Sequence, residues 1–86
     1  MLKIILKIDG MACGMCEAHV NDAIRRAFSV KRVTSSHKAG ETVILTNGDI
    51  PDERLMDAVR GIGYTPVTIR REPYEQKGFF ARIFQK

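Results

Sequence analysis

The chain has 86 residues and a mass of 9.7 kDa, which is the size of one domain with a thin hydrophobic core. Its hydrophobic content of 44% argues against intrinsic disorder, and no apolar run approaches the ~18 residues that a membrane span needs. The net charge is +4, and most of it lies over residues 70–86, which carry five basic and two acidic side chains. We therefore expect no nucleic-acid binding, because the rest of the chain is nearly neutral and holds no recognition motif.

Residues 2–9 alternate between apolar and polar side chains, and this period of two predicts a strand with one apolar face. The uninterrupted apolar run within it covers residues 4–6, which is shorter than the ~7–15 residues of a signal-peptide core. We therefore expect a cytoplasmic chain. In that reducing compartment, Cys13 and Cys16 are expected to bind metal or to take part in redox chemistry rather than to form a structural disulfide.

Apolar side chains recur at three- and four-residue spacing over residues 17–28, which predicts a helix that begins at about Cys16. Residues 30–37 predict a weak strand, because Val33 is the main apolar residue among polar ones, and we place this strand at a sheet edge. A short turn then leads to a stronger strand over residues 41–46, which holds three apolar residues in a row.

A second helix is predicted to have Pro51 in its first turn, since the fixed φ of proline suits that position. Its apolar stripe consists of Leu55, Ala58, Val59 and Ile62, and the glycines that end it are Gly61 and Gly63. The last strand is predicted over residues 65–71, with Val67 and Ile69 on one face. Pro66 near its start indicates an edge strand, because proline cannot donate to a neighbouring strand.

The predicted order of elements is strand-helix-strand-strand-helix-strand, which is the ferredoxin-like α+β unit. Right-handed crossovers place both helices on one face of a four-stranded antiparallel sheet, which gives a two-layer βαββαβ sandwich. The two strands that the sequence marks as edges, the second and the fourth, are the edge strands of this topology. Because Glu72 and Pro73 break the strand pattern, we expect a folded domain over residues 1–71 and a basic, partly amphipathic tail over residues 72–86. The tail is expected to touch a membrane surface or a partner groove if it does not remain disordered.

Cys13 and Cys16 lie three residues apart in a Gly-rich loop between the first strand and the first helix. Two thiolates at this spacing can bind one ion, and soft thiolate ligands select soft metals such as Cu(I). The N-terminus of the helix adds amide donors and a partial positive charge, which lower thiol pKa values and stabilise an anionic metal–dithiolate site. The pair therefore predicts a soft-metal site. Two cysteines that serve only to fill the core fit such a loop less well.

The run Gly-Met-Ala-Cys-Gly-Met-Cys at residues 10–16 resembles the Gly-Met-Thr/Ser-Cys-x-x-Cys pattern of the heavy-metal-associated domains. Gly63-Tyr64 resembles the Gly-Tyr that follows the second helix in bacterial members of that family. The resemblance covers about residues 2–70, including the order of elements. The sequence departs from the pattern at Ala12, where the usual residue carries a hydroxyl group, in the Gly-Met between the cysteines, and in the extra tail.

The heavy-metal-associated domains comprise small copper chaperones and N-terminal modules of P-type ATPases that transport copper and other soft metals. The resemblance implies that Cys13 and Cys16 bind Cu(I) as the default cargo, with Zn(II), Ag(I), Cd(II) and Hg(II) as other candidates. It also implies transfer by thiolate exchange with the cysteine pair of a partner, either a soft-metal ATPase or another Cys-x-x-Cys protein that accepts metal. We expect no enzymatic activity, and both a monomer and a metal-bridged dimer are compatible with the pattern.

Five other side chains bear on the site. Met11 is expected to anchor the loop in the core rather than to bind metal, and Met15 to lie at the surface or to add a weak thioether ligand. The resemblance implies that Tyr64 lies beside the cysteines, where it shields the ion from water. His19 is expected to face solvent, and so is His37, which has no cysteine near it in the sequence.

Three other functions stay open on the sequence alone. A thiol–disulfide oxidoreductase also places Cys-x-x-Cys at a helix start, and Thr65-Pro66 resembles the proline beside such sites. The order of elements differs from that class, however, and the Trp or Pro typical of its active sites is absent. A structural zinc module needs four ligands, and the sequence offers only two cysteines. A metal-sensing or interaction domain would engage its partner through the same cysteines.

Overall fold

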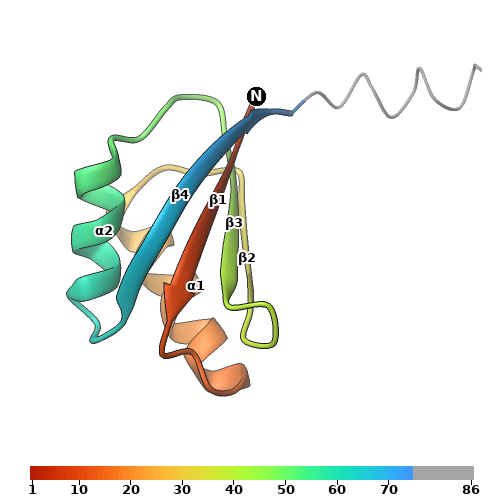
Figure 1. Ribbon diagram of the computed structural model, residues 1–86. Coiled ribbons are helices and arrows are strands. Elements are labelled where there is room, and N and C mark those ends of the chain that lie inside the picture. The colour runs from red at the N-terminus through yellow and green to blue at the C-terminus, as the bar shows by residue number, and fades with distance from the viewer. Residues whose placement is uncertain (75–86) are drawn as a thin grey trace, which may run out of the picture.

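The computed structural model describes residues 1–74, so the predicted apolar face of the tail lies outside the described residues. Six elements follow one another along the chain: β1 (Leu2–Asp9), α1 (Gly14–Ala27), β2 (Arg32–Ser36), β3 (Glu41–Thr46), α2 (Asp52–Arg60) and β4 (Thr65–Pro73). The order expected from the sequence is therefore confirmed, and Figure 1 shows how the six elements are arranged.

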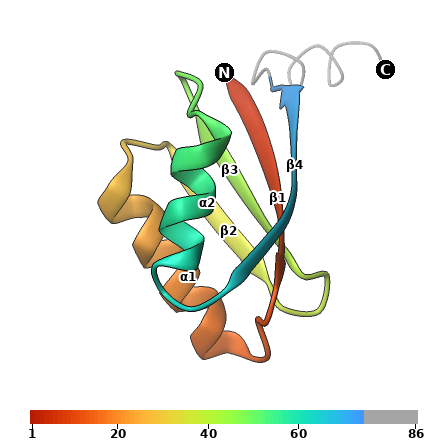
Figure 2. The same ribbon diagram turned by 60° about the vertical axis from the view of Figure 1, so that its left-hand side comes forward.

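The four strands form one sheet in the order β2-β3-β1-β4, and every neighbouring pair is antiparallel. Both helices lie against the same face of this sheet, as the two views show (Figures 1 and 2). β2 and β4 are the edge strands, which confirms the edge positions predicted from their polar residues and from Pro66. The chain thus has the ferredoxin-like βαββαβ fold of the α+β class.

The hydrophobic core lies between the helices and the sheet. Its fully buried apolar side chains come from both layers and are Ile4, Leu6, Val20, Ile24, Ile44, Leu55 and Val59. Complete burial of one such side chain stabilises the fold by about 1.5–3 kcal/mol relative to leaving it exposed. The alternation in β1 and β3 and the three- and four-residue spacing in the helices therefore fix how α1 and α2 sit on the sheet.

α1 begins earlier than the sequence pattern indicates. The predicted start is at about Cys16, but the helix begins at Gly14, because Cys13 has an extended backbone and acts as the N-cap residue. The carbonyl oxygen of Cys13 accepts hydrogen bonds from the N–H groups of Cys16 and Glu17 at 3.0 and 3.3 Å. As a consequence, Cys16 lies inside the first helical turn rather than at its edge.

β4 continues to Pro73, so the expectation that Glu72 and Pro73 end the strand is wrong. An edge strand tolerates proline because the N–H that proline lacks has no neighbour to bond on the outer side. Pro73 lies opposite Leu2, and the next residue, Tyr74, donates its N–H to the carbonyl oxygen of Met1 at 2.9 Å. The last strand thus ends two residues later than the predicted end at residue 71.

A β-bulge in β4 changes the side chains that the strand presents to the core. Lys7 pairs with Thr68 whereas Ile8 pairs with Pro66, so Val67 has no partner in β1. An extra residue of this kind turns the strand locally. Val67 is consequently 56% exposed although Ile69 packs on the core, and the expectation that the two share one face is wrong.

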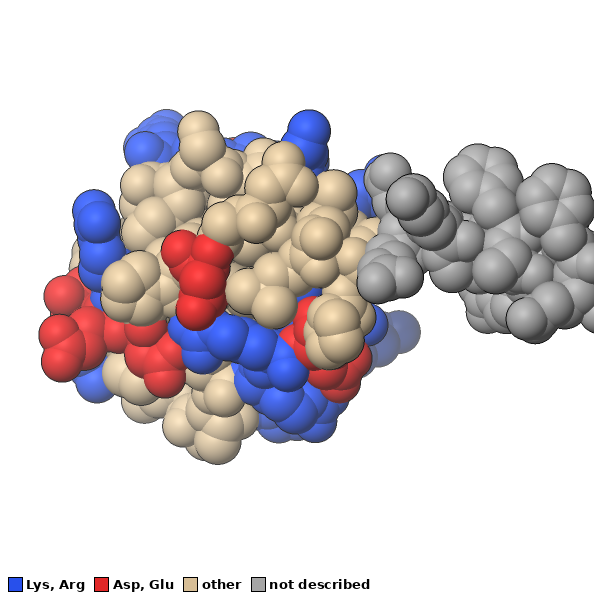
Figure 3. Space-filling view, turned by 90° about the horizontal axis from the view of Figure 1, so that it is seen from above, with Lys and Arg blue, Asp and Glu red and all other residues tan. Residues whose placement is uncertain are grey.

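The described termini meet at one end of the molecule, and the loop with the two cysteines lies at the opposite end (Figure 1). We call these the terminal end and the cysteine end. Viewed onto the terminal end, basic and acidic side chains are interspersed (Figure 3). Among residues 1–74, no helix has both the length and the apolar character that crossing a membrane requires.

Candidate metal-binding site

The loop between β1 and α1 is shaped by Gly10 and anchored by Met11. Gly10 has φ +105°, a conformation that residues with a Cβ rarely adopt. A Cβ at this position would also lie 3.2 Å from Cδ1 of Tyr64, so the ring packs directly over the glycine. Met11 is buried at 8% exposure in the core, and its side chain ties the loop to the rest of the domain.

The two cysteines present their sulfur atoms to one another. The Sγ atoms of Cys13 and Cys16 are 3.9 Å apart, and both thiols are free. Cys13 is exposed and Cys16 is half-buried against the core. Two thiolates in line with one ion need a sulfur separation of about 4.6 Å if each metal–sulfur bond is about 2.3 Å long, as for zinc. The present separation of 3.9 Å is therefore shorter than linear coordination requires, and Cys13 is the exposed member of the pair.

The surroundings of Cys16 favour its ionised form. The nearby hydroxyl group of Tyr64 and then the backbone N–H groups of Ala12 and Cys13 favour the thiolate, and they lower the pKa of the Cys16 thiol from 9.0 to about 7. The same contact raises the pKa of Tyr64, because a neighbouring thiolate disfavours a phenolate. The first turn of α1 adds its partial positive charge. Since the thiolate is the metal ligand, the site is prepared to bind at neutral pH.

The structure brings Tyr64 to the cysteines but leaves the other sequence candidates apart. Met15 lies between the two cysteines in the chain and is 71% exposed. His19 is exposed on α1, where it borders a shallow hollow with Arg26 and Ile62. Ile62 lies in the turn after α2 and is 39% exposed, so it does not extend the buried stripe of that helix as the sequence pattern predicts. Within residues 1–74, no third His, Cys, Asp or Glu joins the cysteines in a metal-binding group.

His37 lies in a different environment from the one expected. Its side chain is only 32% exposed, and its backbone N–H and its Nδ1 both lie 2.7 Å from Oε2 of Glu17, the residue that follows Cys16. The expectation of a solvent-facing histidine is wrong, because the end of β2 passes the first turn of α1. The two residues lie twenty positions apart in the sequence, so the sequence alone does not reveal this contact. The available signal was the spacing: Glu17 and Asn21 share one helical face, and Ser35 and His37 share one side of the chain at β2.

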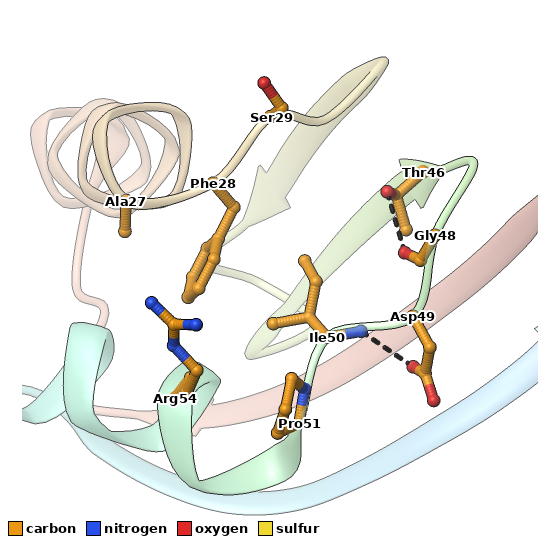
Figure 4. A pocket seen from close by; sticks show the side chains of 9 residues that line it. All are labelled: Ala27, Phe28, Ser29, Thr46, Gly48, Asp49, Ile50, Pro51 and Arg54. Atoms are coloured by element: carbon orange, nitrogen blue, oxygen red, sulfur yellow. Dashed lines mark hydrogen bonds between the residues drawn. The ribbon is translucent and has the colours of Figure 1, made fainter.

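A second hollow lies at the terminal end, far from the cysteines (Figure 4). Phe28, Ile50 and Pro51 line it, and the guanidinium group of Arg54 lies 5.9 Å from the centre of the Phe28 ring. Its polar groups are already engaged, since the Thr46 hydroxyl donates to Gly48 and the N–H of Ile50 donates to its neighbour Asp49. This hollow holds neither a thiol nor a histidine, so the cysteine end is the better candidate for chemistry.

Comparison with known proteins gives two kinds of relatives. No protein-family model matches the chain. The mercuric reductase of Shewanella putrefaciens is 36% identical over 61 residues, which cover 71% of this chain and 11% of that enzyme. The chain therefore spans only a small part of the length of this curated relative.

Solved structures share the fold over nearly their whole length. A chain from the structure described as "Crosstalk between Cu(I) and Zn(II) homeostasis" has a TM-score of 0.68 and 26% identity, over 76% of this chain and 94% of that one. The CopZ metallochaperone has a TM-score of 0.69 and 24% identity, over 76% and 98%, which shows the common fold. The chain thus resembles the heavy-metal-associated domains, as the sequence predicts. It pairs a compact sandwich with a thiol-bearing loop at one end.

Packing and backbone hydrogen bonds hold the loop that carries the cysteines. The N-cap residue Cys13 makes no side-chain hydrogen bond to the helix, and Ala12 beside it carries no hydroxyl group. The ring of Tyr64 over Gly10, the burial of Met11 and the backbone hydrogen bonds to Cys13 maintain the loop instead.

Proposed function

We propose that this domain binds one soft metal ion between Cys13 and Cys16 and passes it to a partner protein by thiolate exchange. The observation that carries the proposal is the thiol pair itself: two free sulfur atoms 3.9 Å apart at the N-terminus of α1. One of them is exposed, and the other has its pKa lowered to about 7 by its neighbours. These are the conditions under which a pair of thiolates binds a soft ion.

The small number of ligands favours ions that accept two thiolates. Closed zinc sites take four protein ligands, and no third His, Cys, Asp or Glu of the described residues accompanies the two cysteines. Met15 is close in sequence and exposed, so it can supply at most a soft thioether to the same ion. The site therefore suits Cu(I), Ag(I) and Hg(II) better than Zn(II).

Cu(I) and Hg(II) are the two cargoes with specific support. Cu(I) fits the bis-thiolate chemistry, and the structural neighbours include a protein described as a metallochaperone. Hg(II) is supported by the similarity to part of a mercuric reductase at 36% identity. We propose Cu(I) as the principal cargo and Hg(II) as the second candidate, and the two predict different outcomes in the competition experiment below.

The two cysteines are suited to different parts of the exchange. Cys13 is exposed and can meet an incoming thiolate first, whereas the half-buried Cys16 keeps the ion on the domain. The partner's thiolate replaces one metal–sulfur bond with another, so no electrons are transferred and the thiol that loses the ion takes up a proton. Such a step requires no catalytic group. We propose a cytoplasmic domain whose partner carries a matching cysteine pair, as in a soft-metal ATPase or a larger metal-accepting protein.

An anaerobic competition titration tests the proposal. The reduced 86-residue protein is titrated with Cu(I), Hg(II) and Zn(II) against a chromogenic chelator, with glutathione present as a competing thiol. We expect tight binding of Cu(I) that is lost in the Cys13→Ala/Cys16→Ala double variant. Met15→Leu shows whether the exposed thioether contributes to this binding. Tighter retention of Hg(II) than of Cu(I) would make mercury the cargo.

Two results would contradict the proposal. If the double variant retained full binding, the ion would lie elsewhere on the chain. If the chelator kept both soft ions from the wild-type protein, the carrier function would be wrong. The reduction potential of the Cys13–Cys16 pair would then decide whether the domain is a thiol–disulfide oxidoreductase.

A further inference from the structure

Polar side chains join α1 to β2 in two successive contacts. The carboxylate of Glu17 contacts His37, and one helical turn later Oδ1 of Asn21 accepts a hydrogen bond of 2.6 Å from the Ser35 hydroxyl. Ser35 also lies 2.8 Å from the hydroxyl group of Thr42 on β3. We call this row of contacts the α1–β2 seam. It sits at the sheet edge where a thin apolar core ends.

The Glu17–His37 contact is the part of the seam beside the metal site. A single oxygen, Oε2, accepts from both the backbone N–H and Nδ1 of His37, each at 2.7 Å. Because an ionised carboxylate only accepts hydrogen bonds, Nδ1 must carry the proton in this contact. Two donors on one residue fix the carboxylate in position, and with it the first turn of α1.

The first turn of α1 has few other restraints. The N-cap residue Cys13 supplies no side-chain hydrogen bond, and the fully buried residues of the helix begin only at Val20. Gly14 and Met15 are exposed, which leaves Cys16 and Glu17 as the residues of this turn that face the domain. The bridge from Glu17 to His37 therefore adds a contact with the end of β2 that restrains this turn.

We infer that Glu17 and His37 are positioning residues for the metal site. Their bridge holds Cys16 opposite Cys13 and Tyr64. This inference rests on the proposed function, since it explains how the thiol pair keeps its geometry before the ion arrives. Partners of this kind orient metal ligands without touching the ion, and their loss typically lowers metal affinity about 10- to 100-fold.

Three variants of the full chain separate positioning from general stability. Glu17→Ala removes both hydrogen bonds, and we expect Cu(I) affinity to fall about tenfold. Glu17→Gln removes the charge but keeps an oxygen that accepts both bonds, so it should restore most of the affinity. Asn21→Ala breaks the seam one turn farther from the cysteines, and it should lower the melting temperature while leaving the affinity unchanged.

A measurement without metal gives an independent readout. Nitrogen-15 relaxation of the backbone amides from Gly14 to Glu17 reports the order of the first turn in the reduced protein. We expect lower order parameters in Glu17→Ala than in the wild type, Glu17→Gln or Asn21→Ala. If the wild type bound no soft metal, the proposed function would fail, and these order parameters would still decide whether the bridge holds the turn.

Two outcomes would overturn the inference. One is wild-type affinity together with wild-type order in Glu17→Ala. The other is a Glu17→Gln variant that behaves like Glu17→Ala in both measurements, because the charge of the carboxylate, and not its bridge to His37, would then support the site.

Discussion

The ring of Tyr64 rests on Gly10, with Cδ1 only 3.2 Å from the place where a Cβ of residue 10 would lie. The two residues lie at the same end of the sheet, one directly after β1 and the other directly before β4, where Asp9 pairs with Thr65. Their contact places the Tyr64 hydroxyl group beside the sulfur of Cys16. Gly10 and Tyr64 thus act together to set the pKa of the Cys16 thiol.

Gly10→Ala should disrupt the contact between residue 10 and Tyr64 in two ways. The φ of +105° is strained for alanine, at a cost of about 1–2 kcal/mol, and the new methyl group displaces the ring. We expect a lower free energy of unfolding in urea and a higher pKa of Cys16. Gly48→Ala is the matched control, because its Cβ would meet no atom within 4 Å. Equal losses of stability in the two variants would contradict the special role of residue 10.

Tyr64→Phe keeps the ring and removes the hydroxyl group that favours the Cys16 thiolate. The pKa of Cys16 should then rise from about 7 toward its ordinary value of 9.0, and the ultraviolet absorbance of the thiolate followed against pH measures it. A lowered pKa favours the folded state above the unfolded pKa, and this contribution is lost as pH falls through the folded pKa. The stability difference between wild type and variant should therefore grow from about pH 7 to pH 9. A difference that stays constant over this range would show that the hydroxyl group does not act on Cys16.

The sequence was sufficient to predict the order of elements, both edge strands and the thiol pair, because periodicity and the loop motif are local signals. It was insufficient where an outcome depends on contacts between distant segments. The start of α1 depends on the backbone of Cys13. The exposure of Val67 depends on a bulge opposite β1. The half-burial of His37 depends on a carboxylate twenty residues away. The residues Glu17 and His37 carry no motif, and their spacing becomes informative only once α1 is known to pack beside β2.

Arg71 should hold the start of α2 on β4. Its Nε lies 2.7 Å from Oδ1 of Asp49, and its Nη2 lies 2.5 Å from Oδ1 of Asp52 and 2.6 Å from the carbonyl oxygen of Ile50. We expect Arg71→Ala to lower the urea midpoint clearly. Arg71→Lys should lower it too, because lysine lacks the planar set of donors. Arg70→Ala, on an arginine that is 68% exposed, is the control and should have little effect.

The Arg71 contact also predicts a dependence on acid. The guanidinium group lowers the pKa of Asp49 below its ordinary value of 3.8. The contribution of the lowered pKa is present above the unfolded pKa and disappears as pH falls through the folded pKa. The stability gap between wild type and Asp49→Asn should accordingly shrink below about pH 4, as urea unfolding at successive pH values would show. A gap that widened in acid would contradict this assignment.

Val67 and Ile69 offer a test of the bulge in β4. Both are β-branched and two residues apart, so a regular strand would bury both or neither. The bulge instead leaves Val67 56% exposed and packs Ile69 on the core. We expect Val67→Ala to change the free energy of unfolding by less than about 0.5 kcal/mol. Ile69→Ala should cost about 1–2 kcal/mol, which is less than a fully buried isoleucine because its site is only partly covered. Equal costs in urea unfolding would mean that β4 is regular in solution, and Pro66 would then no longer pair with Ile8 beside the cysteine end.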